Sequence, residues 1–336
     1  MQSKFIKTVF AGVLAISSSI QAQAEDQTIL NASYDIAREL FASYNPIFAE
    51  HWQEKTGKTI EIKQSHAGSS SQARSILQGM PVDVVTFNQV TDVQILHDRG
   101  NLIPADWKAQ LPNDSSPYYS TTAFLVRKGN PKQIQDWGDL AKDDVALVFP
   151  NPKTSGNGRY TYLAALGYAQ KAFGKESTSE QDAFLKQFLD NVAVFDTGGR
   201  GATTSFVERG IGDVLITFES EVNNIRQQYG VDEYEVVVPK TSILAEFPVA
   251  VVERNAKKNG SLEVSTEYLN YLYSEKAQRL LAGFNYRVHN EAVKAEFAEK
   301  FPAVDLLTVE QIIGSWDSAM TELFASGAKL DQLQRR

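Results

Sequence analysis

The chain has 336 residues, of which 43% are hydrophobic, so it is long enough for two domains with substantial cores. Its net charge of −8 argues against a nucleic acid or an anionic membrane surface as a partner. It contains no cysteine, which excludes disulfides, a thiolate nucleophile and cysteine-ligated metal sites.

Residues 1–24 have the composition of a secretory signal peptide. Lys4 and Lys7 precede an apolar run at residues 9–20, and the run is followed by Ala22 and Ala24 around a glutamine. The apolar run is too short for a membrane helix, which needs roughly 20 residues, and no later run qualifies. We therefore expect cleavage after Ala24 and export to a bacterial periplasm.

Strand-like and helix-like segments alternate along the first part of the mature chain. The strand-like segments are residues 29–32, 60–63 and 82–87, and the helical ones are 35–44, 47–54, 73–79 and 91–99. Pro46 is expected to break or kink the first helix near Asn45, because proline has no N–H group. This alternation predicts a parallel sheet with right-handed crossovers.

A second series of the same kind lies between residues 121–128 and 247–254, two strand-like segments that we expect to pair and to connect the lobes. Its strands are predicted at 145–149, 192–195, 213–217 and 234–238, and its helices at 161–173, 180–189, 205–209 and 219–229. The predicted fold class is therefore α/β, with two lobes that are each a mainly parallel sheet flanked by helices and with the ligand in the cleft. We assign residues 25–120 and 250–336 to lobe I, with the C-terminal helices packed outside the lobes, and residues 121–249 to lobe II.

Three turns rich in glycine, serine and threonine follow predicted strands, at residues 65–71, 154–158 and 195–204. Glycine removes the β-carbon that would block close approach, and a helix start offers free N–H groups and a positive dipole end. One such turn is often only a tight connection. Three of them, one in the first lobe and two in the second, favour a small anion held between the lobes.

The polar groups of these turns are mostly hydrogen-bond donors. They are backbone amides and the side chains of Ser69, Ser70, Thr154, Ser155, Asn157 and Thr203, with Arg159 and Arg200 as the nearby cations. Donors alone suit sulfate, whereas hydrogen phosphate must also donate a proton and would lack an acceptor. Asp35 or Asp196 could supply that acceptor, although we expect each to cap a helix or to pair with an arginine.

Other chemistries have less support in the residues. The chain has no Gly-Lys-Ser/Thr phosphate loop and no G-x-G-x-x-G spacing in its glycine-rich turns, so we expect no nucleotide cofactor. His66 lies near Ser69, but without a G-x-S-x-G elbow an exported ester hydrolase is the weaker alternative. The histidines show no H-x-x-x-H spacing, so we expect no metal site.

Residues 64–70, 151–157 and 196–206 resemble turns of the prokaryotic sulfate/thiosulfate-binding proteins, the periplasmic receptors of an ABC importer. The resemblance extends to residues 33–35, 124–131 and 243–246, and so spans the mature chain. It implies a type II periplasmic binding protein, a monomer with no cofactor that meets the importer's membrane permease subunits transiently. It also implies ligand donors at Ser69, Ser155, Gly156, Asn157 and Gly199, with Asp35, Ser70, Arg159 and Arg200 in supporting positions.

Phe218 departs from the pattern of the sulfate branch, which this resemblance identifies by a tryptophan indole donor at that position. Phenylalanine cannot donate, and an aromatic wall suits the soft sulfur of thiosulfate better than an N–H donor does. The resemblance therefore favours a receptor for thiosulfate, which we expect to bind sulfate as well. A receptor specific for sulfate or for another tetrahedral oxyanion such as molybdate or phosphate is the alternative.

Overall fold

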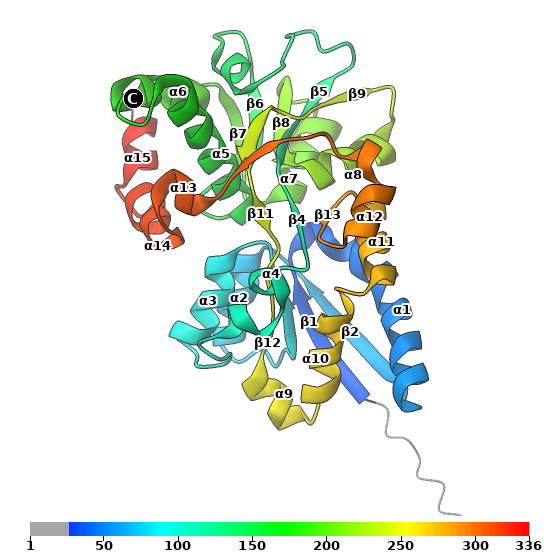
Figure 1. Ribbon diagram of the computed structural model, residues 1–336. Helices are drawn as coiled ribbons and strands as arrows, with labels where there is room; N and C mark the ends of the chain where they lie inside the picture. Colours follow the sequence, from blue (N-terminus) through cyan, green and yellow to red (C-terminus); the bar gives the residue numbers. More distant parts are fainter. Residues whose placement is uncertain (1–26, 336) are drawn as a thin grey trace, which may run out of the picture.

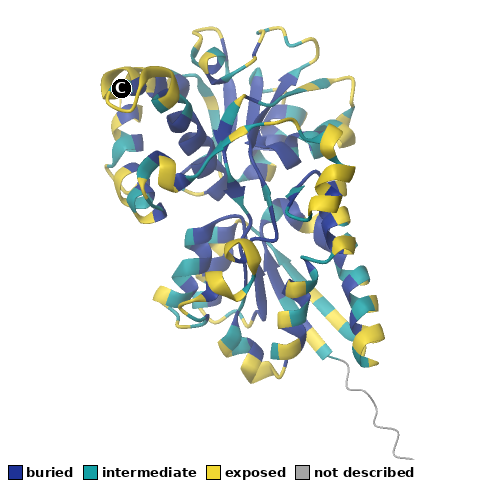
Figure 2. Ribbon diagram, in the orientation of Figure 1, coloured by how far each residue is buried: buried dark blue, intermediate teal, exposed yellow. Residues whose placement is uncertain are grey.

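The computed structural model describes residues 27–335, so the predicted signal peptide at residues 1–24 lies outside the described part of the chain. The chain folds into two lobes, one below the other in Figure 1, and each lobe has its own sheet covered by helices. The central strands of each sheet are buried, the edge strands β2 (Ile60–His66), β7 (Val192–Asp196) and β9 (Tyr234–Val237) are partly exposed, and the outward faces of the helices are exposed (Figure 2). This arrangement agrees with the predicted two-lobed α/β fold.

The first lobe contains a four-stranded sheet in the order β12-β3-β1-β2. Strands β1, β2 and β3 are parallel, and β12 is antiparallel to β3. The strands are β1 (Gln27–Ser33), β2 (Ile60–His66), β3 (Val84–Thr86) and β12 (Val249–Val251). The helical segments around this sheet are η1 (Asp35–Ala37), α1 (Arg38–Thr56), α2 (Ser69–Leu77), α3 (Val90–Asp98), η2 (Trp107–Gln110), α4 (Pro112–Ser115), α9 (Glu253–Asn259), α10 (Leu262–Tyr271) and α11 (Glu275–Gly283).

The second lobe contains a five-stranded sheet in the order β7-β6-β8-β5-β9. Strand β6 is parallel to β7 and β8, whereas β5 is antiparallel to β8 and β9. The strands are β5 (Thr122–Arg127), β6 (Leu147–Pro150), β7 (Val192–Asp196), β8 (Val214–Phe218) and β9 (Tyr234–Val237). The helical segments are η3 (Trp137–Ala141), α5 (Gly156–Phe173), α6 (Thr178–Asp190), α7 (Gly199–Thr203), the π-helix η4 (Thr204–Glu208) and α8 (Glu219–Tyr229).

The lobes are joined by β4 (Tyr118–Ser120) and β11 (Ala245–Glu246), which pair antiparallel between them (Figure 1). A third strand, β13 (Arg287–Val288), pairs with the other edge of β4. The expected pairing of residues 121–128 with 247–254 is wrong, because β5 joins the sheet of the second lobe and β12 joins that of the first. The strands that connect the lobes are shorter than expected. Strand β4 lies directly before residues 121–128, and β11 lies directly before residues 247–254.

The C-terminal region also differs from the sequence-based division, which placed residues 250–336 with the first lobe. Strand β14 (Asp305–Leu307) pairs with β10 (Thr241–Ile243), and α13 (Val309–Ile313) and α15 (Lys329–Gln334) pack on α5 and α6. The remaining short helices are α12 (Glu291–Glu296), η5 (Ala298–Lys300), α14 (Trp316–Ser318) and the π-helix η6 (Ala319–Phe324). The end of the chain therefore lies with the second lobe (Figure 1), because its buried face, including Leu330, finds its partner there.

Helix α1 continues through Pro46, where a break or a kink was expected, so the helix is not broken there. Proline leaves one carbonyl of the preceding turn without its donor. Four large side chains on one face of the helix, Phe41, Tyr44, Phe48 and Trp52, are nonetheless buried. Their packing outweighs the local penalty, since most helix stability in proteins comes from tertiary contacts.

Candidate anion-binding site

A small cavity lies between the lobes at the carboxyl ends of the parallel strands. It has a volume of ≈ 20 Å³, which is little more than the space one water molecule needs, so only a solute of a few atoms fits. The first lobe contributes Asp35, Ile36, Gly68, Ser69 and Asn88 to its wall, and the second contributes Thr154, Ser155, Gly156, Asn157, Thr197, Gly198 and Gly199. All three predicted turns therefore meet at one cavity.

Helix α5 begins in this wall. Ser155 is its N-cap residue and accepts a long hydrogen bond of 3.5 Å from the Gly158 N–H. The N–H groups of Gly156 and Asn157 belong to the first turn, where no intrahelical acceptor exists, and neither has an acceptor within residues 27–335. The Asn157 side chain is used elsewhere, because its Nδ2 donates to Thr217 Oγ1 at 2.6 Å. The α5 start therefore offers main-chain donors and a positive dipole end to the cavity.

Gly156 and Gly158 are required here for different reasons. A β-carbon on Gly158 would lie 2.1 Å from the Pro150 carbonyl oxygen, inside the turn itself. A β-carbon on Gly156 would instead lie 2.9 Å from Gln89 Oε1 of the first lobe. Glycine at 156 thus lets the two lobes approach closely at the edge of the cavity.

Helix α2 supplies the matching start from the first lobe. The Ser69 hydroxyl donates to Asn88 Oδ1 at 2.8 Å and accepts from the Asn88 N–H at 3.2 Å. These bonds hold α2 against the segment that follows β3. The Ser69 and Ser70 N–H groups have no acceptor in the described chain, so they remain available to a ligand. The Ser70 hydroxyl is not part of the cavity wall and donates to both oxygens of Asp92, at 2.9 and 2.8 Å.

Gly199, the first residue of α7, forms the part of the cavity wall that comes from the third glycine-rich turn. A β-carbon there would lie 3.5 Å from both Ile36 Cγ2 and Asn157 Nδ2, which shows how closely the lobes meet. Its N–H group has no acceptor among residues 27–335. The glycine-rich turn therefore forms helix α7 itself. The sequence pattern predicts that this helix begins only at residue 205.

Asp35 is the one acidic residue among those that line the cavity. Burial raises the pKa of its carboxyl group, and the backbone amides of Ile36 and Arg200 partly oppose that rise. Its Oδ1 accepts from the Ile36 N–H at 3.1 Å within the first turn of η1, whose N-cap residue is Tyr34 and which has no side-chain cap, so the expected helix cap by Asp35 is not found. Asp35 is consequently the acceptor that a protonated anion could use.

The two arginines that the sequence placed near the ligand lie outside the cavity wall. Arg159 Nε donates to the Pro152 carbonyl at 3.1 Å, and Arg200 pairs with Glu39 at 3.4 Å on the surface. The expected ion pairs of these arginines with Asp35 or Asp196 are not found in the described chain. The cavity wall therefore contains no lysine or arginine.

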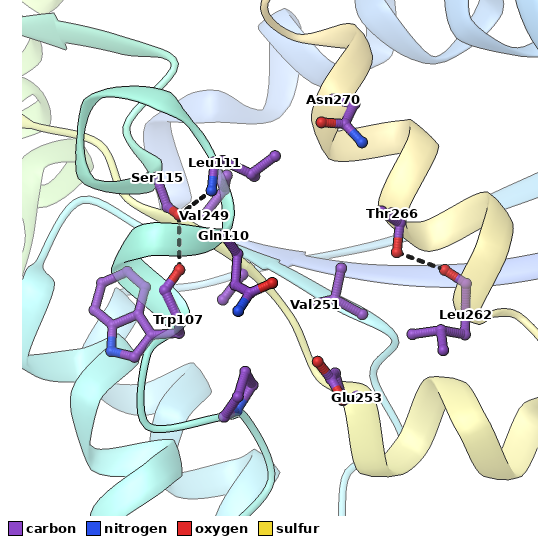
Figure 3. Close-up of a pocket in the computed structure, with 12 residues that line it drawn as sticks. Trp107, Gln110, Leu111, Ser115, Val249, Val251, Glu253, Leu262, Thr266 and Asn270 are labelled. Atoms are coloured by element: carbon purple, nitrogen blue, oxygen red, sulfur yellow. Dashed lines mark hydrogen bonds between the residues drawn. The ribbon is translucent and has the colours of Figure 1, made fainter.

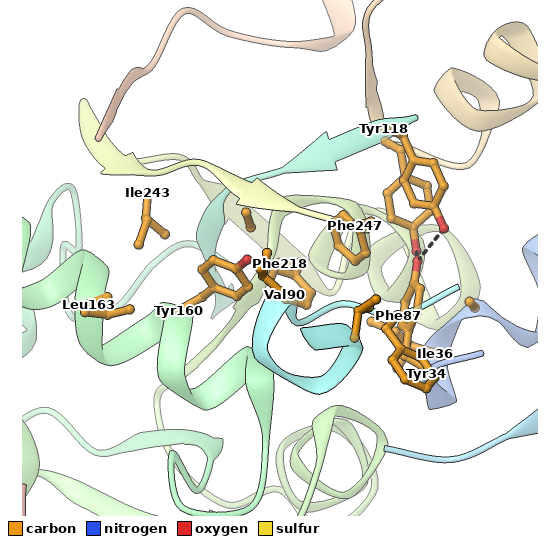
Figure 4. Close-up of a cluster of buried hydrophobic side chains, with 14 of the residues drawn as sticks. Tyr34, Ile36, Phe87, Val90, Tyr118, Tyr160, Leu163, Phe218, Ile243 and Phe247 are labelled. Carbon is orange, nitrogen blue, oxygen red and sulfur yellow. Dashed lines mark hydrogen bonds between the residues drawn. The ribbon is translucent and has the colours of Figure 1, made fainter. Parts of the chain in front are cut away.

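Phe218 is also not brought to the cavity. Its ring is fully buried and packs edge-on against Tyr160 and Phe247, with centroid distances of 5.9 and 5.1 Å. Figure 4 shows these rings within the aromatic cluster that continues to Tyr34 at the junction of the lobes. The structure thus gives Phe218 a packing role and does not show the aromatic wall against the ligand that was expected.

His66, the candidate for hydrolase chemistry, does not pair with Ser69. Its Nδ1 lies 2.6 Å from Ser33 Oγ, whereas the Ser69 hydroxyl is engaged with Asn88. Among residues 27–335, no group of three His, Asp or Glu side chains could hold a metal ion. In the same part of the chain no helix has both the length and the apolar character to cross a membrane.

Asn88 is the cavity residue that the sequence interpretation missed. It follows β3 without a glycine, so the turn pattern that found the other three starts does not mark it. The available signal was a polar pair, Asn88 and Gln89, placed directly after a buried strand and before a helix. Such a pair also lies at the carboxyl end of the sheet.

A separate pocket of ≈ 90 Å³ lies in the first lobe between η2 and α10 (Figure 3). Its wall is largely apolar, with Trp107, Leu111 and Val249 among the lining residues. The Ser115 hydroxyl in this wall already donates to the Trp107 carbonyl at 2.8 Å. Unlike the cavity between the lobes, this pocket is not lined by any of the three glycine-rich turns.

Comparison with known proteins places the chain in a family. Residues 36–287 match the model for a bacterial extracellular solute-binding protein. A thiosulfate-binding protein of Escherichia coli is 58% identical over 321 residues, 95% of each chain, and one of Pseudomonas aeruginosa is 46% identical over 99% of each. A sulfate-binding protein of Escherichia coli is 44% identical over 97% of this chain and 98% of its own.

The solved structure of the sulfate-binding protein SubI from Mycobacterium tuberculosis has the same fold, with a TM-score of 0.79 and 29% identity, covering 89% of this chain and 99% of its own. These relatives are binding proteins and not enzymes. The family predicted from the three turns is therefore confirmed. The chain belongs to the bacterial extracellular solute-binding proteins, in the family of the thiosulfate-binding and sulfate-binding proteins.

Proposed function

We propose that this chain captures thiosulfate, and sulfate with it, in the cavity between its lobes and delivers the anion to an ABC importer. The observation that carries the proposal is the convergence of unpaired N–H groups, from α2 and α5, on a cavity with no lysine or arginine in its wall. Amides at helix starts can bind a dianion through contact dipoles.

The order of preference between the two anions rests on the relatives rather than on Phe218. The most similar of the three curated relatives compared, at 58% identity, is named for thiosulfate, and the one named for sulfate is 44% identical. Phe218 is buried away from the cavity, so it gives no direct support for either anion. We place the protein in the periplasm, as a monomer that meets the permease subunits of the importer transiently.

A second candidate ligand is hydrogen phosphate, and Asp35 is the observation that favours it. Its carboxylate lies in the cavity wall, where it could accept the proton that this anion carries. An ionised Asp35 would instead repel a fully deprotonated dianion such as sulfate. Burial raises the pKa of this carboxyl group, and hydrogen bonds from the Ile36 and Arg200 backbone amides oppose that rise.

Calorimetric titration of the purified chain with thiosulfate, sulfate, molybdate and phosphate tests the proposal. We expect thiosulfate and sulfate to bind and phosphate to bind far more weakly. The variant Asp35→Leu keeps much of the side-chain volume and removes both acceptor oxygens, whereas asparagine would keep one. Tight phosphate binding that Asp35→Leu abolishes would establish the second candidate, and failure of both sulfur anions to bind would refute the first.

A further inference from the structure

Gln89, on the segment between β3 and α3, carries a side-chain amide whose burial nothing else in the described chain explains. The residue is 0% exposed, yet neither its Nε2 nor its Oε1 atom has a hydrogen-bond partner among residues 27–335. Buried polar groups in folded proteins are nearly always paired, because an unpaired one is costly. The described chain itself therefore supplies no partner for this amide.

The Gln89 side chain lies against Gly156 of the cavity wall, although Gln89 is not itself among the residues that line the cavity. Its Oε1 atom lies 2.9 Å from the position that a β-carbon on Gly156 would occupy, and Asn88 Oδ1 lies 3.1 Å from the same position. Gly156 and Asn88 both line the cavity, and the Gly156 N–H group has no acceptor there. A half-turn of the terminal amide would exchange the Oε1 and Nε2 positions, so a donor can be presented at the same point.

The segment that carries Gln89 is held firmly in place. The neighbouring Asn88 makes two hydrogen bonds with the Ser69 hydroxyl, at 2.8 and 3.2 Å, which fix it to the start of α2. Gln89 itself is the N-cap residue of α3, and its carbonyl accepts from the Asp92 N–H at 3.2 Å. The amide is therefore positioned beside the free α2 and α5 starts before any ligand arrives.

We infer that Gln89 is a ligand-binding residue whose amide donates a hydrogen bond to the captured anion when the lobes are closed. This inference rests on the proposed function and adds a fourth turn to the three that the glycines mark. Gln89 and Gly156 come from different lobes, so their contact joins the two lobes beside the cavity. A hydrogen bond from the amide to the anion would therefore favour the arrangement in which the lobes touch around the ligand.

The variant Gln89→Leu tests this inference, because leucine keeps most of the side-chain volume and removes both polar atoms. If the amide contacts the anion, one anion atom loses its donor, and binding of thiosulfate and sulfate should weaken roughly tenfold to a hundredfold in calorimetric titration. If the amide contacts nothing, its removal relieves a buried unpaired group, and affinity should be unchanged or higher. The direction of the change therefore decides between the two roles.

A second variant and a control keep the test clear. Gln89→Glu has nearly the same shape but places a carboxylate beside the dianion, so it should bind even more weakly than Gln89→Leu, and equal or tighter binding would overturn the inference. Thr91→Val is the matched control, since Thr91 Oγ1 is also buried without a partner but Thr91, unlike Gln89, is not among the nearest neighbours of Gly156. It should bind like the unmodified chain. Failure of the unmodified chain to bind either anion would refute the proposed function instead.

Discussion

Gly156→Ala adds a single methyl group where the second lobe meets the first. Gly156 is the first residue of α5, and alanine favours a helix over glycine by about 1 kcal/mol in helix interiors. Within its own lobe the change should therefore be neutral or stabilising. Across the boundary, however, the new β-carbon would lie 2.9 Å from Gln89 Oε1 and 3.1 Å from Asn88 Oδ1, where ordinary contact begins at 3.4 Å.

The lobes must then separate by several tenths of an ångström, or buried side chains must move. Overpacking of this kind costs about 1–3 kcal/mol, which corresponds to a dissociation constant roughly 5-fold to 150-fold higher. The cost applies to closure and not to folding. We expect Gly156→Ala to bind thiosulfate more weakly in calorimetric titration while its melting temperature without ligand is unchanged or higher.

Gly68→Ala is the matched control for this prediction. Gly68 lines the same cavity, but a β-carbon there would meet no atom within 4 Å. Its affinity should stay close to that of the unmodified chain. Unchanged binding by Gly156→Ala, or an equal loss in both variants, would refute the argument that close approach of the lobes at Gly156 is needed for capture.

Three further predictions concern the rest of the molecule. Burial and nearby carboxylates raise the pKa of Glu221 from its ordinary 4.5 to about 8, so the unfolded chain binds fewer protons than the folded one between these values. The stabilisation that comes from protonated Glu221 is therefore complete below pH 4.5 and is lost as the pH rises to about 8. If the free energy of unfolding is measured with urea across this pH range, it should fall less with pH in Glu221→Gln than in the unmodified chain. Glu219→Gln breaks the buried ion pair with Arg287, whose bonds are 2.6 and 2.9 Å, and should lower the free energy of unfolding by about 3–5 kcal/mol; a loss below 1 kcal/mol by chemical denaturation would contradict this. Phe218→Trp should destabilise the fold by about 1–3 kcal/mol through overpacking against Phe247, with no gain for sulfate relative to thiosulfate; a gain would place this side chain at the ligand after all.

Much of the site could be predicted because its signal is local. The glycines at 156 and 199 follow buried strands and open helices, and each such turn can be recognised within a few residues. Their convergence follows from the parallel strands, whose carboxyl ends share one edge of a sheet. The bounds of the helices were less accurate, because the glycine turns themselves form the first helical turns that the apolar periodicity does not reveal.

The errors involve contacts between distant parts of the chain. Pro46 has a local cost that the aromatic face of α1 outweighs, and that packing depends on residues far along the chain. Leu330 belongs to a periodic apolar face, but the period does not say which lobe covers it. Phe218 was placed at the ligand by resemblance, whereas its neighbours Tyr160 and Phe247 come from segments whose packing no local pattern predicts.

A crystal structure of the chain with thiosulfate bound tests the central claim most directly. We predict a single anion in the cavity between the lobes, within hydrogen-bonding distance of the backbone N–H groups of Ser69, Gly156 and Gly199 and without a lysine, an arginine or a metal ion in direct contact. An anion found elsewhere, or held chiefly by charged side chains, would contradict the account.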